Sequence, residues 1–275
     1  MHPKEQICNI EGYTAHAAHM SERVRYRRAH PELTAIDKIV IDVLRKKLKK
    51  QKKIRLLDAG CGTGERLRMI LERGGIDPSL VEAVGVDFCE PLIAEAKEKK
   101  IGNERIYENV FVEDLGVLSV DLTFDVVLCL FSVLNNVGKT YEDALRCLAQ
   151  CLATDGVLVF DFIHPKAAEK LFGEKRPELE EKYGGLGTNE YYYVRDSDGS
   201  WGKAYIFSAE HAQQQLKGLG ISMEAIYDIN TYKTPKGKFA ITRPYLVKEE
   251  IFVPDTEHYA KTWENSILIV ANLTV

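Results

Sequence analysis

One stretch in the first quarter of the chain constrains the fold more than any other. An apolar run over residues 54–57 ends in Asp58, and glycines then follow at alternate positions: Gly60, Gly62 and Gly64. Beyond Gly64 the apolar residues recur every three or four positions, as on one face of a helix. The pattern predicts a buried strand, a tight turn and a helix. Glycines in the turn permit unusual backbone dihedrals and let a ligand lie almost against the main chain.

Other glycine-rich loops fit this stretch less well. A phosphate-binding P-loop needs Lys followed by Ser or Thr after its glycines, and none is present. The dinucleotide pattern needs its third glycine three residues after the second, where this chain has Glu65. The stretch instead resembles the cofactor loop of class I S-adenosylmethionine (SAM) methyltransferases, an acidic residue followed by Gly-x-Gly-x-Gly. The resemblance implies a SAM-binding loop made of Asp58, Gly60, Cys61, Gly62 and Gly64.

The bulk properties of the chain are those of a soluble globular protein. Its 275 residues suffice for one large α/β domain, and its net charge of −4 gives no general attraction to nucleic acid or to an anionic membrane. The N-terminus is polar, and no apolar run approaches the roughly 20 residues of a membrane span. Six cysteines lack the paired spacing of a zinc site, so no metal is expected. We therefore expect a reduced, cytoplasmic protein that does not contact a membrane.

From residue 54 onward, expected strands and helices alternate, which is typical of a parallel sheet covered on both faces. An amphipathic helix over 33–50 precedes the first strand, and the helix after the glycine loop stops at Gly74-Gly75. The five expected strands cover residues 54–57, 81–86, 106–112, 124–130 and 157–162. Beyond residue 165 the pattern indicates short helices at 166–172 and 177–183, a β-hairpin at 190–207, a helix at 208–219, and strands at 221–232, 239–242, 245–253 and 266–275.

The resemblance to class I methyltransferases covers about residues 54–163, and it implies the rest of the architecture. We expect an α/β fold with a seven-stranded Rossmann-like sheet, five parallel strands followed by an antiparallel pair, and helices on both faces. Residues 223–232 and 266–275 are the candidates for that pair. The chain would form a single domain, 1–275, with an N-terminal cap at 1–32, a SAM-binding core at 33–164, a lid insertion at 165–207, and a C-terminal part of the core at 208–275 that carries a long insertion at 233–265.

Acidic residues follow three successive expected strands, at the edge where open α/β sheets bind ligands. The resemblance implies that Asp58 binds the SAM ammonium group or orders the loop, and that Asp87 accepts both ribose hydroxyls. Asp114 would accept the adenine amine beside the Leu115 backbone N–H, while Phe88 packs on the adenine or ribose. An aspartate after a strand is also a common helix N-cap. Three in succession after this loop favour the cofactor. Further cofactor candidates at these strand ends are Glu113, Leu130 and Phe131.

The segment after the fourth strand bears on the methyl acceptor. Enzymes that methylate amino groups of DNA bases or protein glutamine carry Asn/Asp-Pro-Pro-aromatic there, and residues 129–136 of this chain do not. The segment resembles small-molecule N-, O- or C-methyltransferases instead. Ser132 and Asn135 could orient the acceptor or the methionine carboxylate of SAM, and Asn135 is also a catalytic candidate. His164, after the fifth strand, is the candidate general base, since a histidine titrates near neutral pH; capping of the next helix explains it equally well.

Tyrosines in the expected cap and lid are candidates for substrate binding. They are Tyr13, Tyr26, Tyr192 and Tyr205. Aromatic walls suit a planar or cationic substrate. The residues at 191–193 are three consecutive tyrosines, and on a strand they would alternate between two faces. Packing in the core or within a hairpin explains most of these tyrosines as well.

The sequence therefore predicts a SAM-dependent methyltransferase that acts on a small molecule and releases S-adenosylhomocysteine. One alternative is an RNA methyltransferase that uses the basic run at residues 45–55, although a solvated helix end explains that run and a nucleic-acid partner is not expected. A second alternative is an enzyme that cyclises or cleaves SAM itself. A third is a SAM-binding protein without turnover. The sequence does not predict an oligomeric state.

Overall fold

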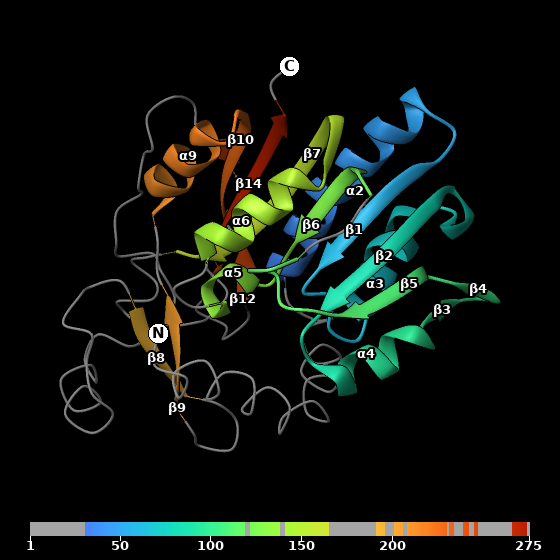
Figure 1. Cartoon of the computed structure of the whole chain (residues 1–275), viewed down its shortest axis with the longest axis horizontal. Coiled ribbons are helices and arrows are strands. Elements are labelled where there is room, and N and C mark those ends of the chain that lie inside the picture. The colour runs from blue at the N-terminus through green and yellow to red at the C-terminus, as the bar shows by residue number, and fades with distance from the viewer. Residues whose placement is uncertain are drawn as a thin grey trace.

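A computed structural model of the chain describes residues 31–118, 122–137, 141–164, 191–195, 201–205, 208–229, 231–233, 239–241, 245–246 and 266–273 (Figure 1). The described residues form one large mixed sheet with helices on both of its faces. Tyr13 and Tyr26, and the expected helices at 166–172 and 177–183, lie outside the described residues. No helix within the described part of the chain is long and apolar enough to cross a membrane.

The main sheet confirms the expected seven-stranded arrangement and adds one short strand. Its order is β13 (Tyr245–Leu246), β10 (Ile221–Ile229), β14 (Ser266–Leu273), β7 (Leu152–Ile163), β6 (Phe124–Cys129), β1 (Ile54–Ala59), β2 (Val81–Asp87) and β5 (Tyr107–Val112). The five strands from β7 to β5 are parallel. β14 runs antiparallel between β7 and β10, as the sequence predicts for the last two strands. Strand order reverses between β1 and β6, which places the switch point beside the glycine loop.

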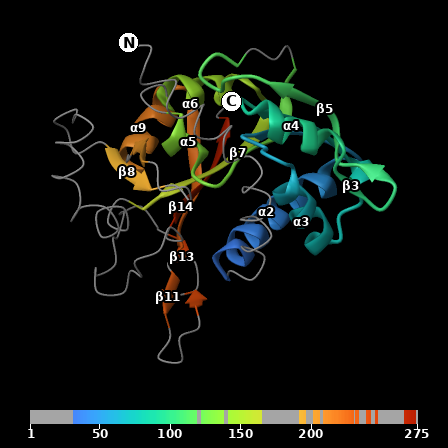
Figure 2. The same cartoon turned by 90° about the horizontal axis from the view of Figure 1, so that it is seen from below.

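Two hydrophobic layers enclose the sheet. On one face, α2 (Pro31–Lys50), α3 (Glu65–Gly74) and α4 (Glu90–Lys97) pack on β1 and β2 through residues such as Leu44, Leu67 and Ile93. On the other face, α5 (Val133–Asn136), α6 (Tyr141–Gln150) and α9 (Ala209–Gly218) pack on β6, β7 and β14. Figure 2 shows α6 and α9 on the side of the sheet opposite α2 and α3.

Local signals in the sequence set several of these element ends. α3 ends at Gly74, and Gly75 caps it with a left-handed φ of 55°. Ser208 caps α9, because its side chain accepts a hydrogen bond from the backbone N–H of His211. Asp155, at the tight turn inside β7, also has a positive φ, of 63°. The caps confirm the helix ends that the sequence predicts.

Shorter elements surround the sheet. A 3-10 helix, η1 (Pro78–Leu80), precedes β2, and β3 (Lys100–Ile101) pairs with β4 (Glu104–Arg105). β8 (Tyr191–Arg195) and β9 (Trp201–Tyr205) form the expected antiparallel hairpin. The single strand expected at 221–232 is wrong, because β10 ends at Ile229 and β11 (Thr231–Lys233) pairs separately with β12 (Phe239–Ile241).

Candidate cofactor site

The glycine turn after β1 has the backbone that its sequence predicts. Gly60, Gly62 and Gly64 all have positive φ, of 73°, 52° and 73°. These left-handed dihedrals are strained for any residue with a Cβ, which accounts for glycine at alternate positions. The backbone N–H groups of Gly60 and Cys61 donate to the Val86 carbonyl at 2.7 and 3.0 Å, so the turn is fastened to the end of β2.

The three glycines differ in what surrounds them. A Cβ on Gly60 would lie 2.5 Å from Cγ2 of Val133, and one on Gly64 would lie 2.6 Å from Cε2 of Tyr107. These two glycines are therefore needed for packing within the protein. Among the described residues, a Cβ on Gly62 would meet nothing within 4 Å. As far as these residues go, a flat or extended ligand could lie against the backbone at Gly62.

Asp87, at the end of β2, joins the glycine turn to the start of α4. Its carboxylate is 9% exposed, and it accepts hydrogen bonds from the backbone N–H of Gly62 and of Cys89, each at 2.9 Å. Burial raises the pKa of Asp87, while these bonds act to lower it. The backbone N–H of Phe88 also donates to this carboxylate. Three backbone N–H groups therefore orient Asp87 at the carboxyl end of β2.

Asp58 closes β1 on the same side of the turn. It is buried, and its Oδ2 accepts a hydrogen bond from the Tyr107 hydroxyl at 2.5 Å. Burial raises the pKa of Asp58 from its ordinary value of 3.8 to about 6, whereas the Tyr107 hydrogen bond lowers it. Within the described residues Tyr107 is the only hydrogen-bond donor to this side chain. The sequence pattern does not predict this role of Tyr107, although the glycine at position 85 inside a strand indicates a close approach of another group.

The segment after β5 lies beside Asp87. The backbone N–H of Glu113 donates to the Asp87 carbonyl at 3.0 Å, and Asp114 accepts the N–H of Gly116 through Oδ1 at 2.8 Å. Leu115 is buried. Phe88 is half-buried beside Asp87. The residues predicted to bind adenosine therefore follow the ends of two paired strands, β2 and β5.

The end of β6 makes an unusual turn. Phe131 and Ser132 both have positive φ, of 71° and 54°, which is uncommon for residues other than glycine. The Asp161 carboxylate, on β7, accepts hydrogen bonds from the backbone N–H groups of both residues, with 3.3 Å to that of Ser132. Asp161 thereby holds a strained turn in place, and such strain is concentrated at functional sites. Leu130, just before the turn, is buried.

Arg66 connects this turn to α2. Its guanidinium lies 4.6 Å from the centre of the Phe131 ring and 2.9 Å from Oδ1 of Asp37, with both charged groups buried. Asp37 also pairs with Arg73. No sequence signal predicts this ion pair, because its partners lie on two helices and 29 residues apart. The pair fixes the first described helix against the site.

Asn135 and His164 lie near each other, close to the turn at Phe131 and Ser132. Asn135 is fully buried, and its Oδ1 accepts a hydrogen bond from the backbone N–H of Ile163 at 3.0 Å. His164 follows Ile163 directly at the end of β7 and is 3% exposed. The structure thus places Asn135 as a link between α5 and β7, next to the histidine predicted to act as a base.

The hairpin β8–β9 separates two of the predicted substrate residues. Tyr191 pairs with Tyr205, and Tyr192 pairs with Ala204. Tyr192 and Tyr205 are therefore not cross-strand partners.

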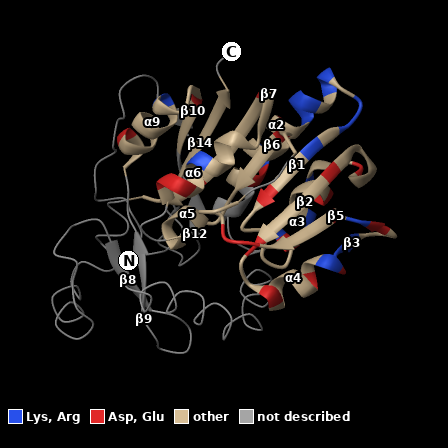
Figure 3. Cartoon of the chain, in the orientation of Figure 1, with Lys and Arg blue, Asp and Glu red and all other residues tan. Residues whose placement is uncertain are grey.

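The site as a whole gathers carboxylates at the carboxyl ends of parallel strands. Figure 3 shows acidic residues at the ends of β1 and β2, whereas basic residues crowd the far end of α2. A cationic ligand fits this set of carboxylates, and no described residue would lie within 4 Å of a Cβ on Gly62. Among the described residues, no group of three or more His, Cys, Asp or Glu side chains is arranged to hold a metal ion.

Comparison with known proteins finds similarity to methyltransferases. Residues 57–158 match the methyltransferase-domain family. The malonyl-[acyl-carrier protein] O-methyltransferase of Bacillus cereus is 27% identical over 148 residues, which cover 52% of this chain and 50% of the relative. The chain spans about half the length of the first curated relatives that it matches.

Solved structures share the fold across nearly the whole chain. Magnesium protoporphyrin IX methyltransferase from Synechocystis, crystallised with SAH, has a TM-score of 0.58 and 14% identity, covering 98% of this chain and 100% of that one. The SAM-bound amino pentose methyltransferase CalS10 from Micromonospora echinaspora has a TM-score of 0.54 and 18% identity, covering 93% of this chain and 97% of that one. At these identities the likeness establishes the fold alone.

Proposed function

We infer that this chain, a class I SAM-dependent methyltransferase, transfers the methyl group of SAM to a small-molecule acceptor. The observation that carries the inference is Gly62, where a Cβ would meet no described residue within 4 Å, beside two buried carboxylates, Asp58 and Asp87. In this proposal the Asp58 carboxylate binds the ammonium group of SAM, and Asp87 accepts the ribose hydroxyls. Asp114 and the Leu115 backbone bind the adenine edge, and Phe88 covers its face.

Bound SAM supplies an electrophilic methyl group on a sulfonium cation. The remaining work of the protein is to align an acceptor with that methyl group and to exclude water. The turn at Phe131 and Ser132 suits alignment, because Asp161 and Arg66 hold it in one conformation. We assign to Ser132 the orientation of the acceptor, and to Asn135 the support of the Ile163 backbone.

His164 is the proposed general base for an acceptor that must lose a proton. It follows β7, directly after the residue that Asn135 fixes, and it is buried beside the turn that holds Ser132. A neutral imidazole there would take the proton from a hydroxyl or ammonium acceptor as the new bond to carbon forms. The names of the relatives support a small acceptor: one acts on a malonyl group of a carrier protein, another on a porphyrin and another on an amino pentose.

Calorimetry with SAM and with S-adenosylhomocysteine tests the cofactor assignment. Asp87→Asn keeps the size of the side chain but removes its charge, and we expect SAM to bind about ten to a hundred times more weakly, as for lost hydrogen bonds to a charged group. Asp125→Asn is the matched control, because Asp125 also accepts a backbone N–H, that of Arg55 at 2.7 Å, at the opposite end of β1. Failure of the wild-type protein to bind SAM at millimolar concentration overturns the proposal.

Product analysis separates methyl transfer from the other uses of SAM. The protein is incubated with methyl-labelled SAM and a panel of small acids, amines and hydroxyl compounds. Labelled product together with S-adenosylhomocysteine supports the proposal. Methylthioadenosine would identify cleavage or cyclisation of SAM, and tight binding without any product across the panel would favour a binding protein.

A further inference from the structure

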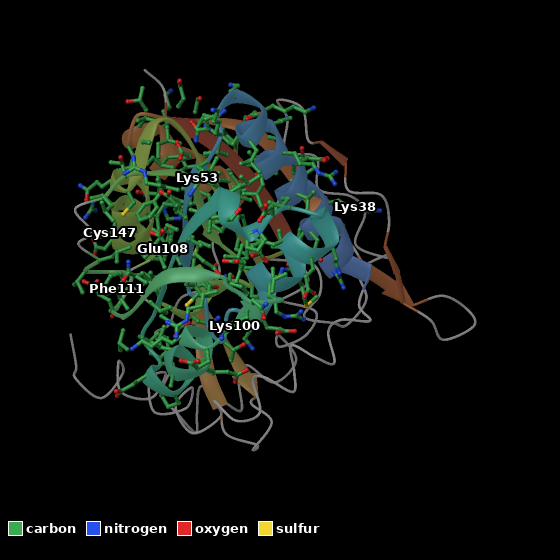
Figure 4. All side chains as sticks on the ribbon, turned by 90° about the vertical axis from the view of Figure 1, so that its right-hand side faces the viewer. Lys38, Lys53, Lys100, Glu108, Phe111 and Cys147 are labelled. Atoms are coloured by element: carbon green, nitrogen blue, oxygen red, sulfur yellow. The ribbon has the colours of Figure 1, made fainter. Side chains whose placement is uncertain are left out.

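Tyr107 occupies an unexpected position for a residue of an edge strand. β5 is the outermost strand on its side of the sheet, and Glu108 and Phe111 lie at its surface, with Phe111 46% exposed (Figure 4). Tyr107, the first residue of the same strand, is only 4% exposed. The register explains the difference: Tyr107 pairs with Ala83 and Asn109 pairs with Val84, so Glu108 is the extra residue of a β-bulge. Bulges re-aim side chains, and here the residue beside the bulge is turned inward.

Two small residues on one face of β2 leave room for the Tyr107 ring to reach across this strand from β5 to β1. Ala83 and Gly85 are two residues apart, so they share one face of the strand, and both are small. A Cβ on Gly85 would lie 3.2 Å from Cε1 of Tyr107 and 3.0 Å from Sγ of Cys61. Any larger residue at position 85 would crowd the ring. Gly85 pairs with Asp58 on β1, so this room lies directly beside that carboxylate.

The Tyr107 side chain contacts the proposed cofactor loop at two points, Asp58 and Gly64. The Tyr107 hydroxyl donates to Oδ2 of Asp58 at 2.5 Å. The edge of its ring lies under Gly64, where a Cβ would be 2.6 Å from Cε2. The same residue therefore supports the last glycine of the turn and the carboxylate that precedes the turn.

We propose that Tyr107 is a positioning residue of the cofactor site, whose hydroxyl holds the Asp58 carboxylate oriented and ionised for the ammonium group of SAM. The proposal rests on the function inferred above. Because Tyr107 is the only donor to Asp58 among the described residues, it occupies Oδ2 and leaves Oδ1 for the cofactor. Without this bond the carboxylate would have no donor among the described residues. Burial and the charge of Asp87 would then favour its protonated form, opposed by the charge of Arg66. A protonated Asp58 cannot pair with an ammonium group.

The consequence is that the affinity for SAM depends on pH through Asp58, and that loss of the Tyr107 hydroxyl shifts this dependence. The pKa of Asp58 is about 6, so the affinity of the wild-type protein for SAM is expected to fall as the pH drops through that value. The Tyr107 hydrogen bond acts to lower this pKa. Its removal should therefore move the loss of affinity to a higher pH.

Tyr107→Phe tests the proposal, because it keeps the ring between Gly64 and Gly85 and removes only the hydroxyl. Calorimetry measures the Kd for SAM between pH 5 and 7.5. We expect a profile displaced upward by about one pH unit, which corresponds to a Kd about twofold higher at pH 7 and about tenfold higher at pH 5. Tyr141→Phe is the matched control, since the buried Tyr141 hydroxyl lies 2.9 Å from Nδ1 of His211 on the other face of the sheet. It should leave the Kd and its profile unchanged.

The outcomes separate this proposal from the function on which it rests. If the wild-type protein does not bind SAM, the function fails; if it binds SAM and Tyr107→Phe has the same Kd and profile, only the role of Tyr107 fails. If circular dichroism shows that Tyr107→Phe does not fold, Gly85→Ala, which crowds the ring, should show the same upward displacement. A wild-type Kd that is constant between pH 5 and 7.5 would overturn the proposal without any variant.

Discussion

At the scale of single residues, the buried carboxylate of Asp58 has opposite effects on the stability of the protein and on the proposed binding of SAM. Folding raises its pKa from 3.8 to about 6, so the folded state holds the proton more tightly than the unfolded chain does. The stability that this group contributes is fully present below about pH 4 and is lost as the pH rises through 6. At neutral pH the buried carboxylate therefore destabilises the protein. A charge kept at that cost fits a residue that binds a cation.

Asp58→Asn should consequently stabilise the protein without SAM and weaken SAM binding. A pKa difference of about 2 units corresponds to a gain of up to about 3 kcal/mol at pH 8, and the gain should vanish near pH 4. Asparagine can still accept the Tyr107 hydroxyl, so packing is retained. Urea unfolding at pH 4 and pH 8 measures both values. An equal effect of the substitution at the two pH values would contradict this account.

Gly62 and Gly75 form a matched pair that separates the effect of Gly62 on SAM binding from the effect of backbone strain on stability. Both have positive φ, 52° and 55°, and a Cβ on either would meet none of the described atoms within 4 Å. Alanine at either position should therefore cost about 1–2 kcal/mol of stability through backbone strain alone. Only Gly62→Ala should also weaken SAM binding, by at least about tenfold, because its methyl group would enter the space assigned to the cofactor. Thermal unfolding and calorimetry on both variants check this, and equal SAM affinities would show that the cofactor does not approach Gly62.

At the scale of elements, the turn between β6 and α5 stores strain next to the proposed acceptor position. Ser132→Gly should relieve that strain and stabilise the protein by about 0.5–1 kcal/mol. It should lower kcat/KM for the acceptor, since it removes the side chain assigned to orientation and loosens the turn. Asp155→Gly relieves a similar φ, 63°, at the turn inside β7, and should stabilise the protein without affecting turnover. Chemical unfolding and steady-state kinetics compare the two; an unchanged kcat/KM in Ser132→Gly would remove Ser132 from the site.

The elements also show which parts of the structure a single sequence can predict. Periodicity and the glycine spacing suffice for β1, the turn and α3, because those features depend on neighbouring residues. The contact between Tyr107 and Asp58 depends on a bulge, on the register of three strands and on a glycine in the middle one. The ion pair between Arg66 and Asp37 depends on how two helices pack. Such contacts leave no periodic signal, so the sequence predicts the strand, the glycine turn and the helix but not the side chains that pack against them.

At the scale of the whole molecule, the two ends of the parallel strands carry opposite charge. The proposed cofactor carboxylates lie at the carboxyl ends, and the basic run lies where α2 ends and β1 begins (Figure 3). The six residues of β1 separate the two regions by about 20 Å. Several of these cations already have partners: Lys46 pairs with Glu224 at 3.9 Å and Lys53 with Glu82 at 3.7 Å. The basic run therefore lies at the opposite end of β1 from the proposed cofactor carboxylates.

Reversing charges in this run tests whether it takes part in function. Lys49, Lys50 and Lys52 are exposed, and replacing all three by Glu changes the net charge by −6, from −4 to −10. Because the positions lie at the far end of β1 from Asp58, we expect an unchanged Kd for SAM and an unchanged kcat/KM for a small acceptor. Filter binding with tRNA at 50 and 200 mM salt provides the other measurement. Each phosphate contact contributes to the salt dependence of binding. The run would instead be a substrate site if the wild-type protein methylates the tRNA, binds it with an affinity that falls steeply with salt, and loses this binding in the triple variant.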